Sequence, residues 1–157
     1  MREKLIREWK KVFEGDLGYI AYELKDMIDM PAVVILNGEM GAGKTTFVKK
    51  YVDTHEQNAK TMSPSYSVLS ETPNILHGDF YRIKETEEIL HLELELYLDD
   101  KQCFLVEWGE KYIGTLVREV PEEYSFYRLN ITINEAQNSE NTDQSRDFSL
   151  EELTDLD

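Results

Sequence analysis

Two runs of apolar residues along the chain have the length and composition of buried strands. Residues 32–36 form a continuous apolar run that is rich in β-branched residues, and 102–108 contain a second apolar run. Strands that are buried on both faces of a sheet show this pattern. The other predicted strands are an edge strand at 7–13, a β-hairpin within 60–83 around 72–74, and a last strand at 124–133.

Between these strands the apolar positions follow the helical period. After Asp16, which is a candidate N-cap, one helical face collects Leu17, Ile20, Leu24 and Ile28. The spacing of Phe47, Tyr51 and Val52 likewise predicts a helix that begins near residue 44.

Residues 87–100 give conflicting signals. Leucines alternate strictly from Leu90 to Leu98, which is the period of a strand. However, the segment consists mostly of Glu and Leu, which are strong helix formers, and it has no β-branched residue after Ile89. We therefore predict a helix here, and a short helix or loop at 111–120.

The stretch GEMGAGKTTF fits the phosphate-binding pattern G-x-x-x-x-G-K-[ST], with Gly38, Gly43, Lys44 and Thr45 at the fixed positions. In this motif backbone N–H groups surround a phosphate, the lysine reaches the β- and γ-phosphates, and the hydroxyl binds Mg²⁺. A glycine-rich turn in an ordinary βα unit is the alternative interpretation. The predicted nucleotide-binding residues are Gly38, Glu39, Met40, Gly41, Ala42, Gly43, Lys44, Thr45 and Thr46.

The strand before this motif and the helix after it are the setting in which a P-loop occurs. Helices and strands that alternate along the chain predict a sheet with helices on both faces. We therefore predict an α/β, P-loop NTPase-like fold, with a mainly parallel sheet, flanking helices and an antiparallel hairpin. The last strand is a further candidate for antiparallel pairing.

Hydrolysis of a nucleotide also requires a carboxylate that holds Mg²⁺ or orients water at the end of a neighbouring strand. Glu107 ends the apolar run of 103–106, and Asp79 follows a shorter one. These two acids are the candidate catalytic residues, and together with Thr45 they are the candidate metal ligands. Either acid could instead be a surface charge at a strand end.

Length and composition indicate one domain in a reducing compartment. The chain has 157 residues and a single cysteine, Cys103, so an internal disulfide is excluded. No apolar stretch approaches the length that crosses a bilayer, and we predict a cytoplasmic protein.

Acidic residues dominate the charge balance. The formal net charge is −15, which predicts no tight direct binding to nucleic acid and no association with a membrane. Residues 135–157 contain eight acidic residues and one arginine. We expect a P-loop domain at 1–134 and, at 135–157, a flexible acidic tail that takes no part in the nucleotide site.

Five segments together resemble the TsaE (YjeE) family of P-loop ATPases. They are GEMGAGKTTF, SPSYSVLSE, HGDFYRI, EEILHLELELYL and FLVEWGE, in the order and spacing of that family, from about Asp16 to Gly109. The chain departs from the family pattern at five positions, one of which is Phe80 in place of a leucine. Ser65 replaces a threonine, Gly78 a phenylalanine, Gly109 a proline, and Glu93 a glycine.

The resemblance implies an Mg²⁺-dependent ATPase. It implies that Lys44, Thr45 and Thr46 contact phosphate and Mg²⁺, that Asp79 and Glu107 form the metal and water side, and that residues 63–66 act as a switch-like segment. Within that segment Ser65 keeps a hydroxyl for the phosphate region. The family's role is ATP hydrolysis in support of TsaB and TsaD proteins, which install threonylcarbamoyl on an adenosine beside the anticodon of certain tRNAs.

The alternative function is that of a small-molecule kinase, which also combines a P-loop with a compact sheet. Such enzymes clamp the transferred group with several arginines and a lid. Only Arg82, Arg118 and Arg128 lie between the motif and the expected tail. A module that binds ATP without hydrolysing it is the other alternative, and the two carboxylates argue against it.

Overall fold

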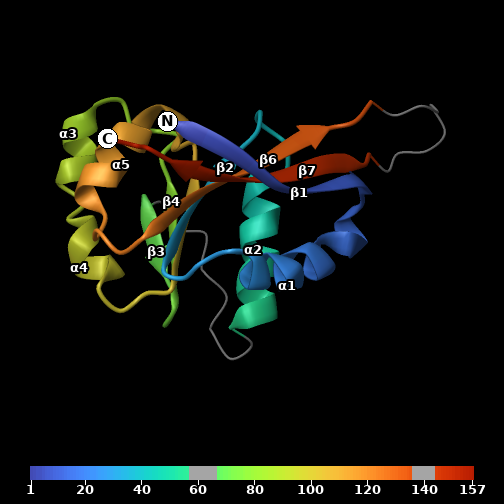
Figure 1. Cartoon of the computed structure of the whole chain (residues 1–157), viewed down its shortest axis with the longest axis horizontal. Coiled ribbons are helices and arrows are strands. Elements are labelled where there is room, and N and C mark those ends of the chain that lie inside the picture. The colour runs from blue at the N-terminus through green and yellow to red at the C-terminus, as the bar shows by residue number, and fades with distance from the viewer. Residues whose placement is uncertain (57–66, 136–143) are drawn as a thin grey trace.

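The computed structural model describes residues 1–56, 67–135 and 144–157. Its strands and helices are interspersed along the chain (Figure 1). The strands are β1 (Arg2–Val12), β2 (Ala32–Asn37), β3 (Leu69–Glu71), β4 (Ile75–Asp79), β5 (Cys103–Glu107), β6 (Ser125–Ile133) and β7 (Arg146–Thr154). The α-helices are α1 (Leu17–Met27), α2 (Lys44–His55), α3 (Thr86–Leu90), α4 (Leu94–Leu98) and α5 (Ile113–Glu119), and 3-10 turns lie at Glu14–Asp16 and Glu110–Tyr112.

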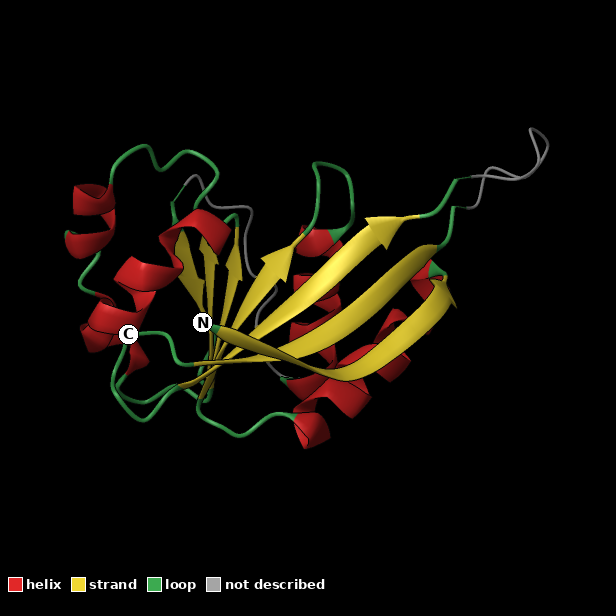
Figure 2. Ribbon diagram, turned by 45° about the horizontal axis from the view of Figure 1, so that its top comes forward, coloured by secondary structure: helices red, strands yellow, loops and turns green. Residues whose placement is uncertain are grey.

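The described strands form one twisted mixed sheet of seven strands in the order β1-β7-β6-β2-β5-β4-β3 (Figure 2). The four central strands, β6, β2, β5 and β4, run parallel. The hairpin partner β3 and the outer strands β7 and β1 pair antiparallel. The α/β fold with a mainly parallel sheet is therefore confirmed. The strand predicted at 124–133 runs parallel to β2 and antiparallel to β7.

Helices cover both faces of the sheet, and each face has its own apolar core. Helices α1 and α2 pack on one face, and α3, α4 and α5 pack on the other (Figure 2). Strand β2 contributes to both cores, because Val34 and Leu36 point to the first and Val33 and Ile35 to the second. A strand that is buried on both faces needs the continuous apolar run seen in the sequence.

Helix α1 follows the predicted face, and Leu17, Ile20, Leu24 and Ile28 are all buried. Asp16 occupies the N-cap position of α1 but makes no side-chain cap to it, because its carboxylate accepts a hydrogen bond from the backbone N–H of Phe13 at 3.0 Å in the preceding turn. In α2 the predicted positions are also buried. These two helices contact each other along their length and carry the first core.

The leucine-rich segment forms two short helices, α3 and α4, which meet at Glu93. Glu93 has φ +55°, in the left-handed region that favours glycine. A continuous helix cannot pass through this conformation, so the chain turns between Leu90 and Leu94. The prediction of helical structure is confirmed, and the break lies where the TsaE pattern has glycine.

The expectation of a flexible tail from residue 135 is wrong for Arg146–Thr154. This segment is β7, which lies between β6 and β1 and pairs with both. Its side chains Phe148, Leu150 and Leu153 are each 3 % exposed or less. The segment is therefore an inner strand of the sheet, and a domain boundary at residue 134 would divide that sheet.

The first strand, β1, forms the edge of the described sheet, as predicted for residues 7–13, and begins earlier than expected, at Arg2. Within the described ranges no helix is both long and apolar enough to cross a bilayer.

Candidate functional site

A glycine loop, residues 38–43, connects β2 to α2. Gly41 and Gly43 have φ values of +85° and +104°, which a side chain would disfavour. A Cβ atom on Gly38 would lie 2.7 Å from the carbonyl oxygen of Ile131 on β6. The backbone of the motif thus depends on glycine at each of these three positions.

The helix that follows the loop offers unpaired backbone N–H groups. Lys44, Thr45 and Thr46 are the first three residues of α2, and Gly43 is the N-cap residue, without a side-chain cap. The first N–H groups of a helix have no partner within it, and the helix dipole adds positive potential there. This arrangement suits a phosphate anion.

The ammonium of Lys44 is buried beside the loop, and the residue is 5 % exposed. It donates a hydrogen bond to the backbone oxygen of Gly38 and lies 3.3 Å from the centroid of the Trp108 ring. Burial lowers the pKa of Lys44, against the opposing effect of the Glu107 and Asp79 carboxylates. The predicted phosphate-binding lysine is therefore in the site.

Glu107 lies at the centre of a hydrogen-bonded chain of three side chains. The Thr45 hydroxyl donates to its Oε1 at 2.7 Å, and Nε2 of His77 donates to its Oε2 at 2.6 Å. Glu107 is 3 % exposed. Burial acts to raise its pKa, but the hydrogen bonds from His77 and Thr45 and the positive charge of Lys44 outweigh that effect, so the pKa lies below its usual value. The carboxylate is ionised at neutral pH.

Asp79 is the neighbour of Glu107 across the sheet. It ends β4, Glu107 ends β5, and the two residues are partners in the parallel register. Its Oδ1 accepts a hydrogen bond from the backbone N–H of Tyr81 at 3.1 Å. The two candidate carboxylates therefore reach the same edge of the sheet, with Glu107 in direct contact with Thr45 and Asp79 one strand away.

These donors suit a magnesium ion that arrives with a nucleotide. Mg²⁺ usually takes one or two carboxylates and a hydroxyl, and completes its coordination with phosphate oxygens and water. Thr45, Glu107 and Asp79 provide such a set. Among the described residues no group of three or more His, Cys, Asp or Glu side chains could hold a metal by itself. A metal here would depend on nucleotide oxygens.

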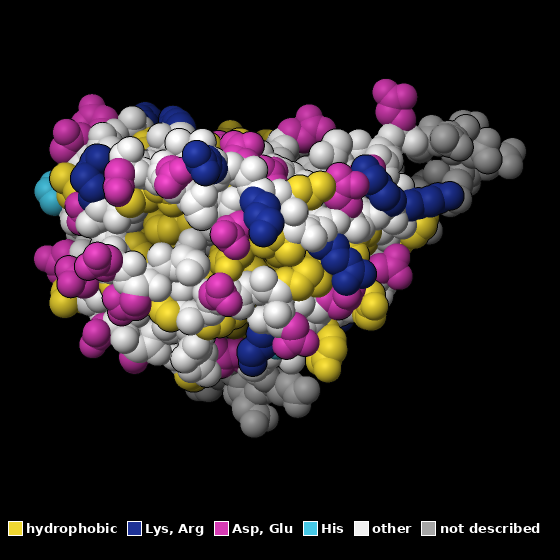
Figure 3. Space-filling model, viewed as in Figure 1, with side chains coloured by type: hydrophobic (Ala, Val, Ile, Leu, Met, Phe, Trp, Pro, Cys, Tyr) yellow, Lys and Arg dark blue, Asp and Glu magenta, His cyan; other side chains and the backbone are white. Residues whose placement is uncertain are grey.

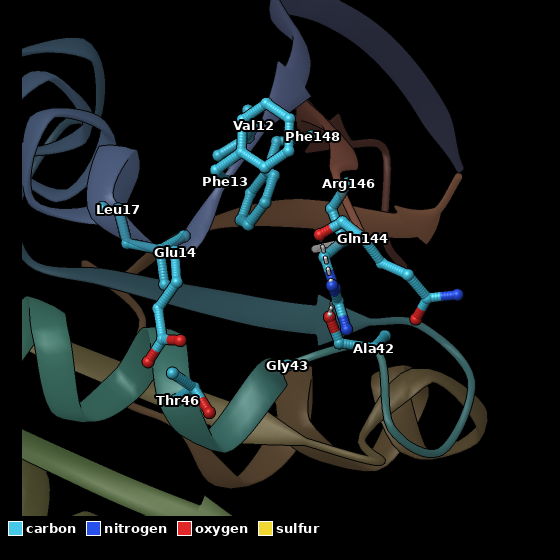
Figure 4. A pocket seen from close by; sticks show the side chains of 11 residues that line it. Val12, Phe13, Glu14, Leu17, Ala42, Gly43, Thr46, Gln144, Arg146 and Phe148 are labelled. Atoms are coloured by element: carbon cyan, nitrogen blue, oxygen red, sulfur yellow. Dashed lines mark hydrogen bonds between the residues drawn. The ribbon is translucent and has the colours of Figure 1, made fainter. Parts of the chain in front are cut away.

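A cavity of about 480 Å³ lies between the glycine loop and the outer strands β1 and β7. Its wall is formed by side chains from β1, the following turn, α1 and β7, and by the loop itself (Figure 4). The apolar members of this wall are Val12, Phe13, Leu17, Ala42 and Phe148, and the polar ones are Glu14, Thr46, Gln144 and Arg146.

Arg146, the first residue of β7, points from this wall to the loop (Figure 4). Its Nε donates to the backbone oxygen of Ala42 at 3.1 Å, and its Nη2 donates to that of Gly41 at 3.3 Å. The expectation that residues 135–157 take no part in the site is therefore wrong. Arg146 could not be found from a motif, because the contact joins positions 104 residues apart.

The remaining predicted residues divide into two groups. Glu39, Met40 and Gly41 form the exposed outer part of the loop, while Ala42 is buried beneath it. Ser65 and the rest of the predicted switch-like segment lie outside the described residues. Sequence reasoning did not find the contact between His77 and Glu107, because it joins two neighbouring strands, β4 and β5, whose pairing exists only in the folded sheet.

The family model described as "Threonylcarbamoyl adenosine biosynthesis protein TsaE" matches residues 13–145. Two curated relatives are described as tRNA threonylcarbamoyladenosine biosynthesis protein TsaE. The one from Rickettsia typhi is 41 % identical over 83 residues, and the match covers 50 % of this chain and 57 % of the relative. The one from Haemophilus influenzae is 32 % identical over 97 residues, with 59 % and 61 % covered. The chain thus matches less than two thirds of the length of these relatives.

A solved structure has a similar fold over nearly the whole chain. The crystal structure of YdiB from Bacillus subtilis superimposes with a TM-score of 0.59 at 23 % identity. The match covers 98 % of this chain and 89 % of that structure. This comparison supports the fold, including the strands that lie outside the region matched in the relatives.

Proposed function

This chain belongs to the TsaE family, and on that premise we propose that it binds ATP with Mg²⁺ at the glycine loop and hydrolyses it. We further propose that the hydrolysis supports threonylcarbamoyladenosine modification of tRNA, and that the chain acts together with TsaB and TsaD proteins. The ATPase does not modify the base itself in this proposal. We propose the cytoplasm as its location.

The observation that carries the proposal is the hydrogen-bonded chain from Thr45 through Glu107 to His77. It joins the start of the phosphate-binding helix to the end of the neighbouring parallel strand. A hydroxyl and an ionised carboxylate in contact, beside a buried lysine, is the combination that phosphoryl chemistry requires. An ordinary βα turn would have no need to bury Glu107.

Each residue then has a distinct role. Lys44 and the N–H groups that open α2 bind the β- and γ-phosphates. Thr45 and Glu107 hold Mg²⁺, which when bound neutralises charge on the phosphates, and His77 fixes the orientation of Glu107. Asp79, one strand away, orients water or completes the metal coordination. The cavity beside Arg146 takes the nucleoside.

The chain offers little with which to stabilise charge on the γ-phosphate by itself. Among the described residues Arg128 is bound by Glu110, Glu3 and Glu151, and Arg146 is bound to loop carbonyls. A partner surface could supply the missing cations and exclude water. With a net charge of −15, a protein partner is favoured over direct contact with RNA.

The kinase alternative has less support from these contacts. Arg118 lines a different groove, formed by α4, the end of α5 and the start of β6. Arg82 is exposed. Arg128 is bound to Glu110, so its guanidinium is not free to bind a phosphate. Of the three arginines between the motif and residue 135, Arg118 and Arg128 are therefore engaged away from the glycine loop.

The test combines purified TsaB and TsaD partners with this chain and follows association and the fate of the γ-phosphate. We expect a complex that depends on ATP, together with faster release of free phosphate, and neither effect with Lys44→Ala. Lack of any nucleotide-dependent complex, with no change in hydrolysis, would contradict the TsaE role. Transfer of labelled phosphate to a small molecule would favour the kinase.

A further inference from the structure

The indole ring of Trp108 lies directly against the ammonium of Lys44. The distance from Nζ to the ring centroid is 3.3 Å, and the ammonium also donates a hydrogen bond to the carbonyl oxygen of Gly38. A lysine ammonium is attracted to the face of an indole, and burial strengthens the attraction because water does not compete. Two uncharged groups thus contact the cation directly, in addition to the electrostatic effect of Glu107 and Asp79.

The backbone at Trp108 is also unusual. Its φ is +59°, a conformation that bulky side chains rarely adopt and that persists only when the surroundings impose it. The next residue, Gly109, has no room for a side chain, since a Cβ atom there would lie 2.7 Å from Cγ1 of Val106. The chain therefore turns sharply after Glu107, and this turn brings the indole over the glycine loop.

The indole also contacts the segment that carries Asp79. The rings of Trp108 and Tyr81 have centroids 5.2 Å apart and are tilted by 53°. The backbone N–H of Tyr81 is hydrogen-bonded to the Asp79 carboxylate. Trp108 therefore links the lysine of the glycine loop to the second candidate carboxylate.

We propose that Trp108 is a positioning residue that holds Lys44 through its ring and releases it to the incoming phosphates. The inference rests on the proposed function, because it assumes that phosphate binds at this loop. A phosphate carries full negative charge, whereas the ring offers only its quadrupole, so the ammonium moves to the phosphate. The indole then loses its cation, and the contact with Tyr81 transmits the change to the Asp79 segment.

Fluorine NMR on protein labelled with fluorinated tryptophan tests this directly. The other tryptophan, Trp9, lies on β1 with its indole N–H on Glu23, and it serves as an internal control. Titration with inorganic pyrophosphate should shift the Trp108 signal and leave that of Trp9 in place, and adenosine should shift neither. Calorimetry on the same samples records whether pyrophosphate binds.

Two substitutions measure the competition between ring and phosphate. Trp108→Leu removes the ring, and we expect it to bind Mg-ATP roughly threefold to thirtyfold more tightly. Trp108→Phe keeps a weaker ring and should give an intermediate affinity. Tyr97→Leu is the matched control, because it removes an exposed aromatic ring on α4 and should leave the affinity unchanged.

The outcomes separate the two proposals. Heat of binding with no shift of the Trp108 signal would overturn the role of Trp108 alone. Equal or weaker Mg-ATP affinity in a folded Trp108→Leu protein would do the same. No heat with either pyrophosphate or Mg-ATP would overturn the nucleotide site, and the role of Trp108 with it.

Discussion

At the scale of single residues, we expect substitution of Lys44 to weaken ATP binding at the proposed site more than any other single change. It brings a buried positive charge to the start of α2, where the phosphates would lie. Lys44→Ala should weaken ATP binding by about 1.5 to 3 kcal/mol, the usual contribution of a charged hydrogen bond. This corresponds to a loss of roughly tenfold to somewhat over hundredfold in affinity, measurable by calorimetry.

Lys49→Ala provides the control for this substitution. Lys49 is an exposed residue of the same helix, and its replacement by alanine removes the same charge from the chain as a whole. Its ATP affinity should stay close to that of the wild type. Equal losses in the two variants would mean that general electrostatics, and not a bound phosphate, accounts for the effect.

The residues of the site were predictable to the extent that local sequence sets their geometry. The spacing of Gly38, Gly43 and Lys44 predicted the loop, and the end of an apolar run pointed to Glu107. The contact of Trp108 with Lys44 was not predictable in this way. It depends on a left-handed turn at one residue and on the packing of two elements that are distant in sequence.

At the scale of elements, the turn between α3 and α4 stores strain at one position. Glu93 has φ +55°, where a side chain costs about 1 to 2 kcal/mol relative to a right-handed conformation. Glycine adopts this conformation freely but loses more entropy on folding. The balance predicts that Glu93→Gly stabilises the protein by about 0.5 to 1 kcal/mol in urea unfolding.

Glu95→Gly tests whether that gain depends on the backbone conformation. Glu95 is also exposed but lies inside α4. Glycine within a helix destabilises by roughly 0.5 to 1 kcal/mol, so this variant should unfold at lower urea concentration. A change of the same sign in both variants would contradict the assigned strain at Glu93.

The second prediction at this scale concerns β7. Leu150 is fully buried in the core that the sheet shares with α1 and α2. Leu150→Ala should therefore lower the free energy of unfolding by about 2 to 5 kcal/mol. Thr154→Ala, at the exposed end of the same strand, should leave it nearly unchanged. An equally small effect of both substitutions would mean that β7 is not part of the folded sheet.

Composition misled the prediction for this strand for a physical reason. Its acidic side chains find partners on other strands, so their charge does not prevent folding. Asp147 pairs with Lys10 and accepts a hydrogen bond from the backbone N–H of Lys11, and Glu151 is bound by Arg128 and Asn130. None of these partners is adjacent in sequence. The alternation of Phe148, Ser149 and Leu150 was the local signal of a strand.

At the scale of the whole molecule, the fold places the first and last strands of the chain beside a site that the central strands form. The parallel strands β2, β5 and β4 deliver the glycine loop, Glu107 and Asp79 to one edge of the sheet. The outer strands β1 and β7 add the cavity wall and Arg146. The glycine loop, Glu107 and Asp79 were predictable because each lies in or directly after a segment whose local sequence indicates its structure. Local sequence could not predict the cavity wall or the position of Arg146, which exist only once the sheet has formed.

The surface of the molecule carries both signs of charge, with acidic side chains spread widely over the face shown in Figure 3 and basic ones interspersed among them. The excess of 32 acidic over 17 basic residues disfavours direct contact with the phosphates of RNA. Under the proposed function, contact with tRNA would therefore be made by protein partners.

The most direct test of the central claim is the rate of phosphate release from saturating Mg-ATP by Glu107→Gln beside the wild type, with and without the partner proteins. Glutamine keeps the size of the side chain and removes the charge that acts on the metal and water. We predict that the variant still binds ATP and releases phosphate at least about tenfold more slowly. Release at the wild-type rate by a variant saturated with ATP would contradict the claim that Glu107 is the catalytic carboxylate of an ATPase.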